Sequence, residues 1–246
     1  MQRKGVDSRD GKSSNTGMYV PESHSEMLIG HGTSSSSQDF CEVCIELLPW
    51  TADRCFRCAR PLAMGLEAIY CETCRERPPS FDRMQALFHY EPPINRMITK
   101  LKFSGDLAYG RILGTLLAQT LQADSHRYPL PQALVPVPLH HKRWVHRGFN
   151  QAQELALVAH KTLGIPLLDK ICMRVKETPA QSTLDKGNRK TNLRKAFRVQ
   201  ALEPLPFEHL AIIDDVVTTG STVDALAAVL KDAGVEQVDV WCIARA

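Results

Sequence analysis

Hydrophobic and polar positions along the chain form blocks that predict strands and helices in turn. Short apolar and β-branched runs, typical of buried strands, lie near residues 84–90, 133–137, 210–213 and 238–244. Apolar residues at helical spacing lie near 94–101, 107–121, 151–163 and from about 221 onward. Because strands alternate with helices, the pattern predicts an α/β fold with a mostly parallel sheet flanked by helices.

Composition divides the chain into three segments. Residues 1–38 are polar and rich in Ser, Gly and His, which predicts a disordered lead-in. Residues 39–79 carry a cluster of cysteines and end at Pro78-Pro79. The helix and strand pattern occupies 80–246, which is the usual length of one α/β domain.

Charge and hydropathy exclude two broad classes. The 30 Lys and Arg residues nearly balance the 27 Asp and Glu residues, so bulk charge gives no argument for a nucleic-acid-binding protein. No apolar run reaches the length of a membrane span, and the N-terminus lacks the apolar stretch of a secretory signal. We therefore expect a cytoplasmic protein that does not insert into a membrane.

The densest candidate chemistry follows the predicted strand at 210–213. Asp214 and Asp215 are expected to be exposed at the strand's C-terminal end, where an open α/β sheet places its ligand crevice. A loop of small, hydroxyl-bearing residues then opens onto a helix that Ser221 or Thr222 can cap. Backbone N–H groups at such a helix start suit a phosphate, and the acids suit sugar hydroxyls or Mg²⁺. The loop residues are Thr218, Thr219, Gly220, Ser221 and Thr222.

Six of the eight cysteines form three Cys-x-x-Cys pairs. A tetrahedral zinc site needs two such pairs, and a cytoplasmic protein would not normally keep them as disulfides. Structural zinc is therefore favoured over redox chemistry. Cys172 and Cys242 stand alone among apolar neighbours and are predicted to be small buried residues. The paired cysteines are Cys41, Cys44, Cys55, Cys58, Cys71 and Cys74.

The segment 210–222 resembles the signature by which type I phosphoribosyltransferases bind phosphoribosyl pyrophosphate (PRPP). The resemblance implies that Asp214 and Asp215 hold the ribose hydroxyls and that the loop 218–222 wraps the 5′-phosphate. It also implies the type I phosphoribosyltransferase fold for residues 80–246, with Mg²⁺ bound together with PRPP.

A wider resemblance covers residues 41–246. Cys-x-x-Cys pairs, then Arg77-Pro-Pro-Ser-Phe-Asp82, then Leu101-Lys-Phe-Ser-Gly-Asp106 and a phosphoribosyltransferase domain resemble the competence-associated ComF/GntX family. Members of that family usually begin with four cysteine pairs, a double zinc ribbon, and the first pair is missing here. If the ribbons are tandem, the pairs 55/58 and 71/74 share one zinc and Cys41 and Cys44 are orphaned. A cross-braced arrangement would change this assignment, but we favour the tandem version because the segment 55–74 reads as one self-contained ribbon. His24 or His31 could complete a second site.

Two basic stretches also match the family pattern. The first, around Lys142, Arg143 and Arg147, reads as a basic loop that corresponds to the pyrophosphate side of the site, followed by a helix that Asn150 can cap. The second, the basic connector 176–195, carries the T-x-x-Q and R-x-x-N-x-x-x-A-F elements and suits a flexible loop that closes over an anion. There Arg189 and Lys190 are the candidate pyrophosphate ligands. A solvated basic surface and a contact with the nucleic-acid backbone are the alternatives.

Three functions remain open at this point. The first is a phosphoribosyltransferase, that is, a glycosyltransferase (pentosyltransferase) of nucleoside metabolism that transfers phosphoribose from PRPP to a nitrogen acceptor. Neither the acceptor nor a catalytic base can be named. The second is a non-catalytic PRPP- or nucleotide-binding protein, and the third is an accessory factor that handles DNA during competence. The partners implied are PRPP, DNA or a competence-machinery protein, and a second copy of the chain in a homodimer.

Overall fold

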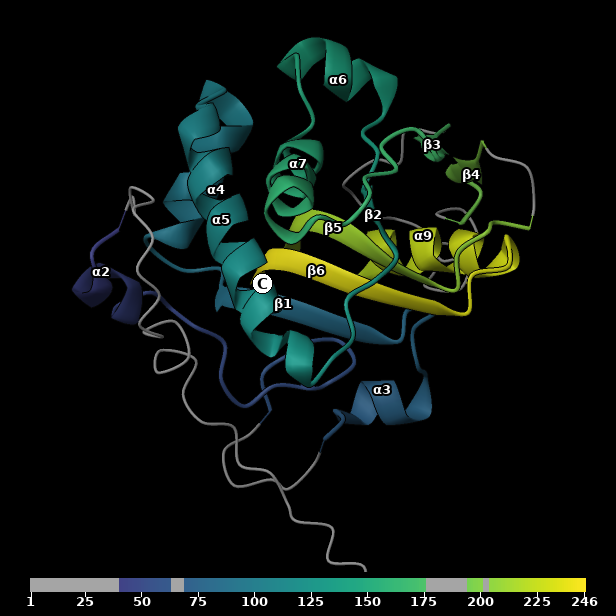
Figure 1. Cartoon of the computed structure of the whole chain (residues 1–246), viewed down its shortest axis with the longest axis horizontal. Helices are drawn as coiled ribbons and strands as arrows, with labels where there is room; N and C mark the ends of the chain where they lie inside the picture. Colours follow the sequence, from purple (N-terminus) through teal and green to yellow (C-terminus); the bar gives the residue numbers. More distant parts are fainter. Residues whose placement is uncertain (1–39, 63–68, 176–193, 201–203) are drawn as a thin grey trace, which may run out of the picture.

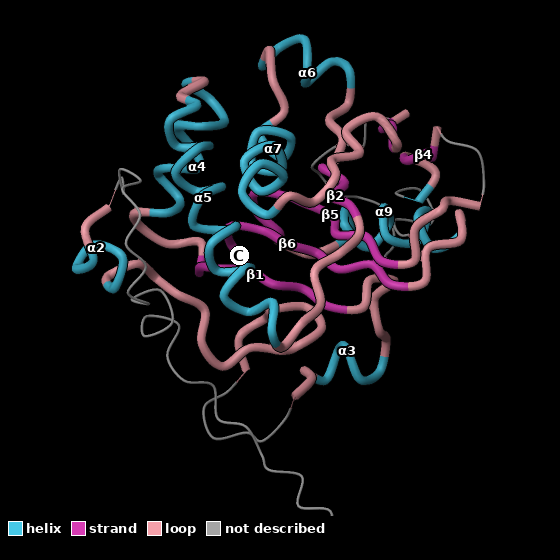
Figure 2. Tube along the Cα trace, in the orientation of Figure 1, coloured by secondary structure: helices cyan, strands magenta, loops and turns pink. Residues whose placement is uncertain are grey.

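In the computed structural model, which describes residues 40–62, 69–175, 194–200 and 204–246, the core is a four-stranded parallel sheet of order β1-β6-β5-β2. The strands are β1 (Arg83–His89), β2 (Ala133–Pro136), β5 (His209–Val217) and β6 (Gln237–Arg245). Their pairings are all parallel, with β5 and β6 in the centre. The predicted mostly parallel sheet is thereby confirmed (Figures 1 and 2).

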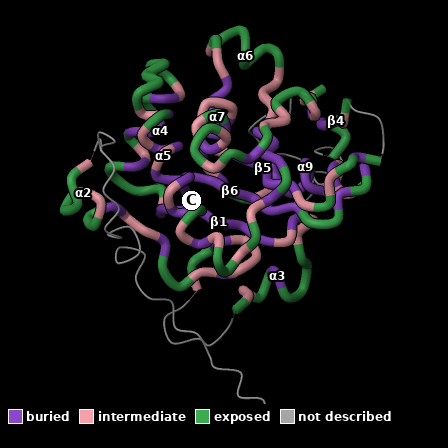
Figure 3. Tube along the Cα trace, viewed as in Figure 1, coloured by how far each residue is buried: buried purple, intermediate pink, exposed green. Residues whose placement is uncertain are grey.

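Helices cover both faces of this sheet (Figure 1). On one face lie α4 (Ile94–Ser104), α5 (Leu107–Ala123) with the short 3₁₀ turn η1 (Asp124–His126), and α7 (Gln151–Leu163). On the other face lies α9 (Ser221–Asp232), beside an antiparallel pair of short strands, β3 (Cys172–Arg174) and β4 (Phe197–Val199). The central strands are buried on both sides (Figure 3), which explains why their sequences are apolar runs.

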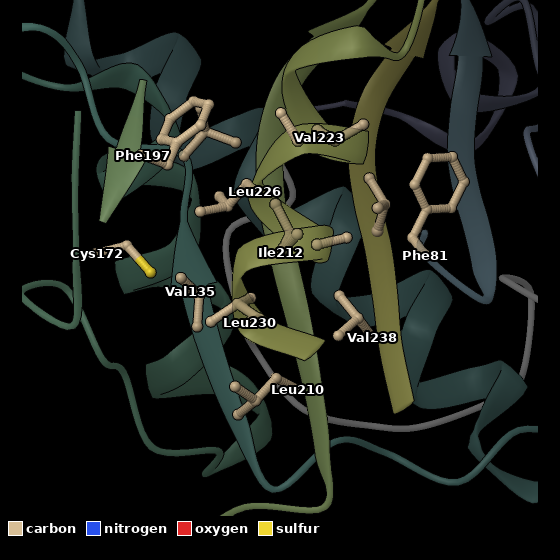
Figure 4. Packing of buried hydrophobic residues seen from close by; sticks show 14 of the residues in the cluster. Phe81, Val135, Cys172, Phe197, Leu210, Ile212, Val223, Leu226, Leu230 and Val238 are labelled. Carbon is tan, nitrogen blue, oxygen red and sulfur yellow. The ribbon is translucent and has the colours of Figure 1, made fainter. Parts of the chain in front are cut away.

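Residues of β5 and β6 alternate between two apolar clusters. Leu210 and Ile212 pack with α9, whereas Ala211 and Ile213 pack with α4, α5 and α7. Figure 4 shows the α9 side, where Val223, Leu226 and Leu230 lie over Leu210 and Ile212. This period-two alternation fixes the register of the sheet, because a slip by one residue would exchange the two faces.

The cysteine-bearing segment packs against the edge of the sheet. It contains the short helices α2 (Glu42–Glu46) and α3 (Glu72–Glu76). The backbone N–H of Thr51 donates to the carbonyl of Leu87, and that of His89 donates to Pro49, so this segment covers the free edge of β1. The ring of Trp50 also packs at a tilt against that of Phe88, with 4.5 Å between ring centroids. Within the described residues, no helix is long and apolar enough to cross a membrane.

The close approach of α5 and α7 depends on Gly114. A Cβ atom at this position would lie 2.8 Å from Cβ of Val158. We expect Gly114→Ala to destabilise the protein by about 1–3 kcal/mol, because overpacking outweighs the gain of up to about 1 kcal/mol in helix propensity. Urea denaturation measures the difference.

Gly110→Ala, in the same helix, is the matched control. Its Cβ would meet Cδ1 of Leu101 at 3.3 Å, which is the end of a flexible side chain. We expect the stability of this variant to stay within about 1 kcal/mol of wild type. Equal destabilisation in both variants would contradict the role of Gly114 in helix packing.

Candidate functional site

The candidate site lies at the C-terminal end of β5, and the strand is longer than its sequence suggested. We expected the strand to end at the two acids, but β5 continues to Val217, so both acids lie within it. The reason is its partner: β6 runs alongside, with Asp214 opposite Cys242 and Val217 opposite Arg245. The carboxylates therefore stand on a rigid strand.

Asp215 is not the exposed acid that we expected. Only 3% of its surface is accessible, and its Oδ2 atom lies 2.5 Å from Nζ of Lys102, at the C-terminal end of α4. Burial of a carboxylate is costly unless a cation compensates it, and Lys102 provides that cation. The guanidinium of Arg147 adds positive charge near Asp215. Burial lowers the pKa of this guanidinium, and attraction to the carboxylate of Asp215 opposes that shift. Sequence reasoning missed Lys102, whose signal was its place in the Leu101–Asp106 motif.

Asp214 is half-buried and lines a small cavity together with residues 216–223. One of its carboxylate oxygens accepts a hydrogen bond of 2.9 Å from the backbone N–H of Asp215. Burial raises the pKa of Asp214 well above its ordinary value, and the negative charge of Asp215 raises it further. The structure thus brings Asp214 and the predicted loop into one cavity, with Asp215 beside it.

The loop between β5 and α9 turns at a glycine in the left-handed region. Gly220 has φ of +81°, which favours glycine, and it is the N-cap of α9. The prediction that Ser221 or Thr222 caps the helix was wrong, because both already lie within its first turn and no side chain caps it. Instead, Oγ1 of Thr219 accepts a hydrogen bond of 3.3 Å from the N–H of Ser221. Thr218 and Thr219 are exposed, so the N-terminus of α9 remains open to a ligand.

A buried arginine that sequence reasoning also missed lies behind this loop. Arg245, at the end of β6, donates from Nη1 to the carbonyl oxygens of Val217, at 2.8 Å, and of Thr218. Its Nε atom donates to the carbonyl of Cys58 at 3.0 Å. No sequence motif marks this residue, because its contacts come from segments distant in the chain.

The basic residues expected on the pyrophosphate side lie on a short helix, α6 (His141–Arg147), rather than on a loop. The side chain of His140 caps this helix, and Gly148, with φ of +79°, ends it. Lys142 and Arg143 are exposed, whereas Arg147 is half-buried and donates to Oε1 of Gln151 at 2.5 Å. The predicted cap at Asn150 is confirmed, since its side chain accepts from the N–H of Ala152.

The expected flexible loop mostly lies outside the described residues, and with it Arg189 and Lys190. The structure does describe both ends of this segment: β3 precedes it and β4 follows it, and the two strands pair with each other. Ala196 and Phe197, from the family pattern, are buried next to α9.

Four cysteines form a second site. The Sγ atoms of Cys55, Cys58, Cys71 and Cys74 lie within 4.8 Å of one another, and those of Cys58 and Cys71 are 3.7 Å apart. In a regular zinc tetrahedron with Zn–S bonds of about 2.3 Å, the sulfur atoms lie about 3.8 Å apart. The cluster therefore fits a zinc ion, and the tandem pairing of 55/58 with 71/74 is confirmed as the set that comes together.

Backbone hydrogen bonds prepare one of these thiols for metal binding. Burial alone would oppose the thiolate of Cys55, but backbone N–H groups around it, including that of Cys71 at 3.3 Å from Sγ, outweigh burial and lower its pKa to about 7. Burial raises the pKa of Cys58 to about 11. Zinc binding at this cluster must therefore displace protons.

The remaining cysteines lie outside this cluster. Cys41 and Cys44 are exposed, and His24 and His31 lie beyond the described residues. Cys172 and Cys242 are buried, as predicted, and burial raises the pKa of Cys172 to about 12.

Comparison with known proteins found several relatives. The chain is 37% identical over 182 residues to Competence protein F of Haemophilus influenzae, which covers 73% of this chain and 80% of that protein. It is 34% identical over 207 residues to DNA utilization protein YhgH of Escherichia coli, with 83% and 89% covered. It is 27% identical over 161 residues to Competence protein ComFC of Streptococcus pneumoniae, with 65% and 67% covered.

A structural comparison found a purine phosphoribosyltransferase from Pyrococcus horikoshii, with a TM-score of 0.31 and 18% identity. The overlap covers 54% of this chain and 70% of that one. No protein-family model matches the chain.

The raised pKa of Asp214 predicts a pH dependence of stability. Because the folded protein holds this proton more tightly than the unfolded chain does, the free energy of unfolding should fall as pH rises from about 4 through the raised pKa. Asp214→Asn should lose this dependence and be more stable than wild type at neutral pH. Urea denaturation across this pH range tests it, with the exposed Asp169→Asn as control. Parallel profiles for wild type and Asp214→Asn would contradict the burial of this charge.

The cysteine cluster predicts which thiols hold metal. Cys55→Ser should release zinc and make the segment 40–82 sensitive to protease, because loss of one ligand opens a four-coordinate site. Cys41→Ser, at an exposed cysteine outside the cluster, should keep its zinc. Metal analysis of the purified variants tests this assignment, and full zinc content in Cys55→Ser would refute it.

Proposed function

The chain belongs to the ComF family of competence-associated proteins, and on that premise we propose that it binds PRPP with Mg²⁺ at the C-terminal end of β5. One observation carries the proposal: Asp214 and the loop 216–223 line the same cavity at the start of α9. A carboxylate can accept hydrogen bonds from ribose hydroxyls, while the adjacent helix N-terminus attracts the 5′-phosphate. The two groups that a phosphorylated sugar requires therefore lie side by side.

We assign the binding of the ribose hydroxyls to Asp214 rather than Asp215, because the ammonium group of Lys102 already neutralises the carboxylate of Asp215. Thr218, Thr219, Gly220, Ser221 and Thr222 would surround the 5′-phosphate with hydroxyl and N–H donors. Mg²⁺, when bound, would bridge pyrophosphate and ribose oxygens with only one or two protein carboxylates. Asp214 is open enough to the cavity to serve as one of them.

Positive charge on the other side of Asp215 suits the pyrophosphate. Lys102 pairs with this acid, and Arg147 interacts electrostatically with it. Arg147, with Lys142 and Arg143 on the same helix, would neutralise a leaving diphosphate. Arg189 and Lys190 would add to it from the segment 176–195. Such a site favours transfer of phosphoribose to a nitrogen acceptor, which would make the protein a phosphoribosyltransferase.

Calorimetric titration with PRPP, with and without Mg²⁺, tests the proposal. We expect Mg²⁺-dependent binding to wild type and a loss of about tenfold or more in affinity for Asp214→Asn, since a hydrogen bond to a charged group is worth about 1.5–3 kcal/mol. Asp169→Asn makes the same change in charge at an exposed position outside the cavity and should bind like wild type. Absence of binding to wild type in the presence of Mg²⁺ would overturn the proposal.

Release of pyrophosphate separates an enzyme from a binding protein. A transferase should release pyrophosphate from PRPP when one of a panel of bases and amines is added. A protein that binds PRPP but releases none with any of them would be the non-catalytic, PRPP-sensing member that the sequence also allows.

A second function, in DNA handling, is favoured by the surface formed by the end of α4 and by α6. Helix α6 contains no acidic residue, and Trp144 and Val145 on it are exposed. Phe103 at the end of α4 is 77% exposed, and the guanidinium of Arg147 lies 5.6 Å from its ring centroid. Basic residues interleaved with exposed aromatic rings suit nucleic acid, and two relatives carry competence or DNA utilization in their names.

This second function predicts DNA binding that weakens steeply with salt and that Phe103→Ala reduces. Asp214→Asn should retain that binding if the DNA surface is separate from the PRPP cavity. Fluorescence anisotropy with a labelled oligonucleotide at several salt concentrations measures it. Binding that is absent at low salt would exclude this function.

A further inference from the structure

The guanidinium of Arg245 joins the two candidate sites. Its Nη1 atom donates to the carbonyl oxygens of Val217 and Thr218, at the start of the loop 216–223, and its Nε atom donates to the carbonyl of Cys58 in the cysteine cluster. Only 5% of Arg245 is exposed. A single buried side chain therefore contacts both the cysteine cluster and the loop proposed to bind the 5′-phosphate.

The contact with Thr218 determines how the loop presents its N–H groups. In a trans peptide the C=O and the following N–H point in opposite directions. When Arg245 holds the carbonyl of Thr218, the N–H of Thr219 is turned away from Arg245. The Nη1 atom alone holds the carbonyls of Val217 and Thr218, together with that of Ala246, so the peptide units at 217 and 218 are oriented together.

The contact with Cys58 makes this arrangement sensitive to metal. A zinc ion with four thiolates carries net negative charge, because the four sulfur charges exceed that of the ion. The carbonyl of Cys58 accepts from Nε of Arg245 at 3.0 Å, so the guanidinium lies beside this cluster. A buried cation is stable only where hydrogen bonds and opposite charge compensate its desolvation. Removal of a bound zinc ion would withdraw this negative charge and would free the backbone around Cys58.

From this geometry we infer that Arg245 is a positioning residue that couples metal occupancy of the cysteine cluster to the conformation of the loop 216–223. The zinc site would then set the affinity of the loop for a phosphorylated ligand, as well as stabilising the segment 40–82. Only the identity of that ligand rests on the proposed function. By linkage, a ligand bound at the loop would in turn strengthen retention of the metal.

Hydrogen exchange measured by mass spectrometry tests the coupling without any ligand. We compare the zinc-loaded full-length protein with the same protein after chelation, and follow peptides that contain residues 217–222. Chelation should accelerate exchange in these peptides by about tenfold or more, because loss of the Arg245 contacts lets the end of β5 and the first turn of α9 open more often. Peptides from α5 and α7, on the opposite face of the sheet, should keep their rates. Unchanged exchange at 217–222, or equal acceleration in α5 and α7, would overturn the inference.

Two variants assign the effect to the side chain. Arg245→Gln and Arg245→Lys should exchange rapidly at 217–222 while zinc is still bound, and chelation should then add little. Arg60→Lys, at an exposed arginine next to the same cysteine pair, should respond to chelation as wild type does. Zinc content is measured in each variant. A zinc-loaded Arg245→Gln with wild-type exchange at 217–222 would contradict the inference.

Titration with PRPP and Mg²⁺ extends the test to affinity. We expect zinc-loaded wild type to bind PRPP about tenfold more tightly than chelated protein, and Arg245→Gln to lose most of that difference. The two proposals fail separately. If wild type binds no PRPP, the proposed function is wrong, whereas the inference on Arg245 is decided by hydrogen exchange alone.

Discussion

The parallel pairing of β5 with β6 determines the positions of Asp214, Asp215 and Arg245. It runs in register from His209 opposite Gln237 to Val217 opposite Arg245. Because helices cover both faces, the middle of these strands must be apolar, and polar chemistry is confined to their ends. At the C-terminal end of β5 lie Asp214 and the loop that leads into α9. Arg245, at the end of β6, lies opposite Val217.

Charges around this end are held in close balance. Asp215 pairs with Lys102, Arg245 is satisfied by carbonyl oxygens, and Asp214 bears a carboxyl group that burial disfavours when ionised. An arrangement of this kind does not maximise stability, since a buried acid with a raised pKa costs free energy at neutral pH. Carboxyl groups with a strongly raised pKa are typical of ligand-binding and catalytic sites.

Much of this was predictable from local sequence. The helix 151–163 was predicted at its observed bounds because apolar spacing and the Asn150 cap are both local signals, and the structure ends it at Gly164. Cysteine spacing predicted the Cys-x-x-Cys pairs for a similar reason, since each pair needs only its own turn to direct two thiols at one point. Which two pairs come together depends on contacts between segments, and the structure brings 55/58 to 71/74.

The missed features depend on contacts between distant segments. The extension of β5 past the two acids follows its pairing with β6, although Val216 and Val217 are residue types that favour a strand. The ion pair of Lys102 with Asp215 and the hydrogen bonds of Arg245 join elements far apart in the chain. Sequence periodicity predicts which face of a helix or strand is buried. It does not predict which charged residue from a distant segment will lie against that face.

The most direct test of the account is hydrogen exchange of the zinc-loaded protein with and without PRPP and Mg²⁺. PRPP should slow exchange at residues 218–222 and at the start of α9, while α5 and the C-terminal half of α7 should be unaffected. Protection elsewhere, with none at 218–222, would show that the end of β5 is not the phosphoribosyl site.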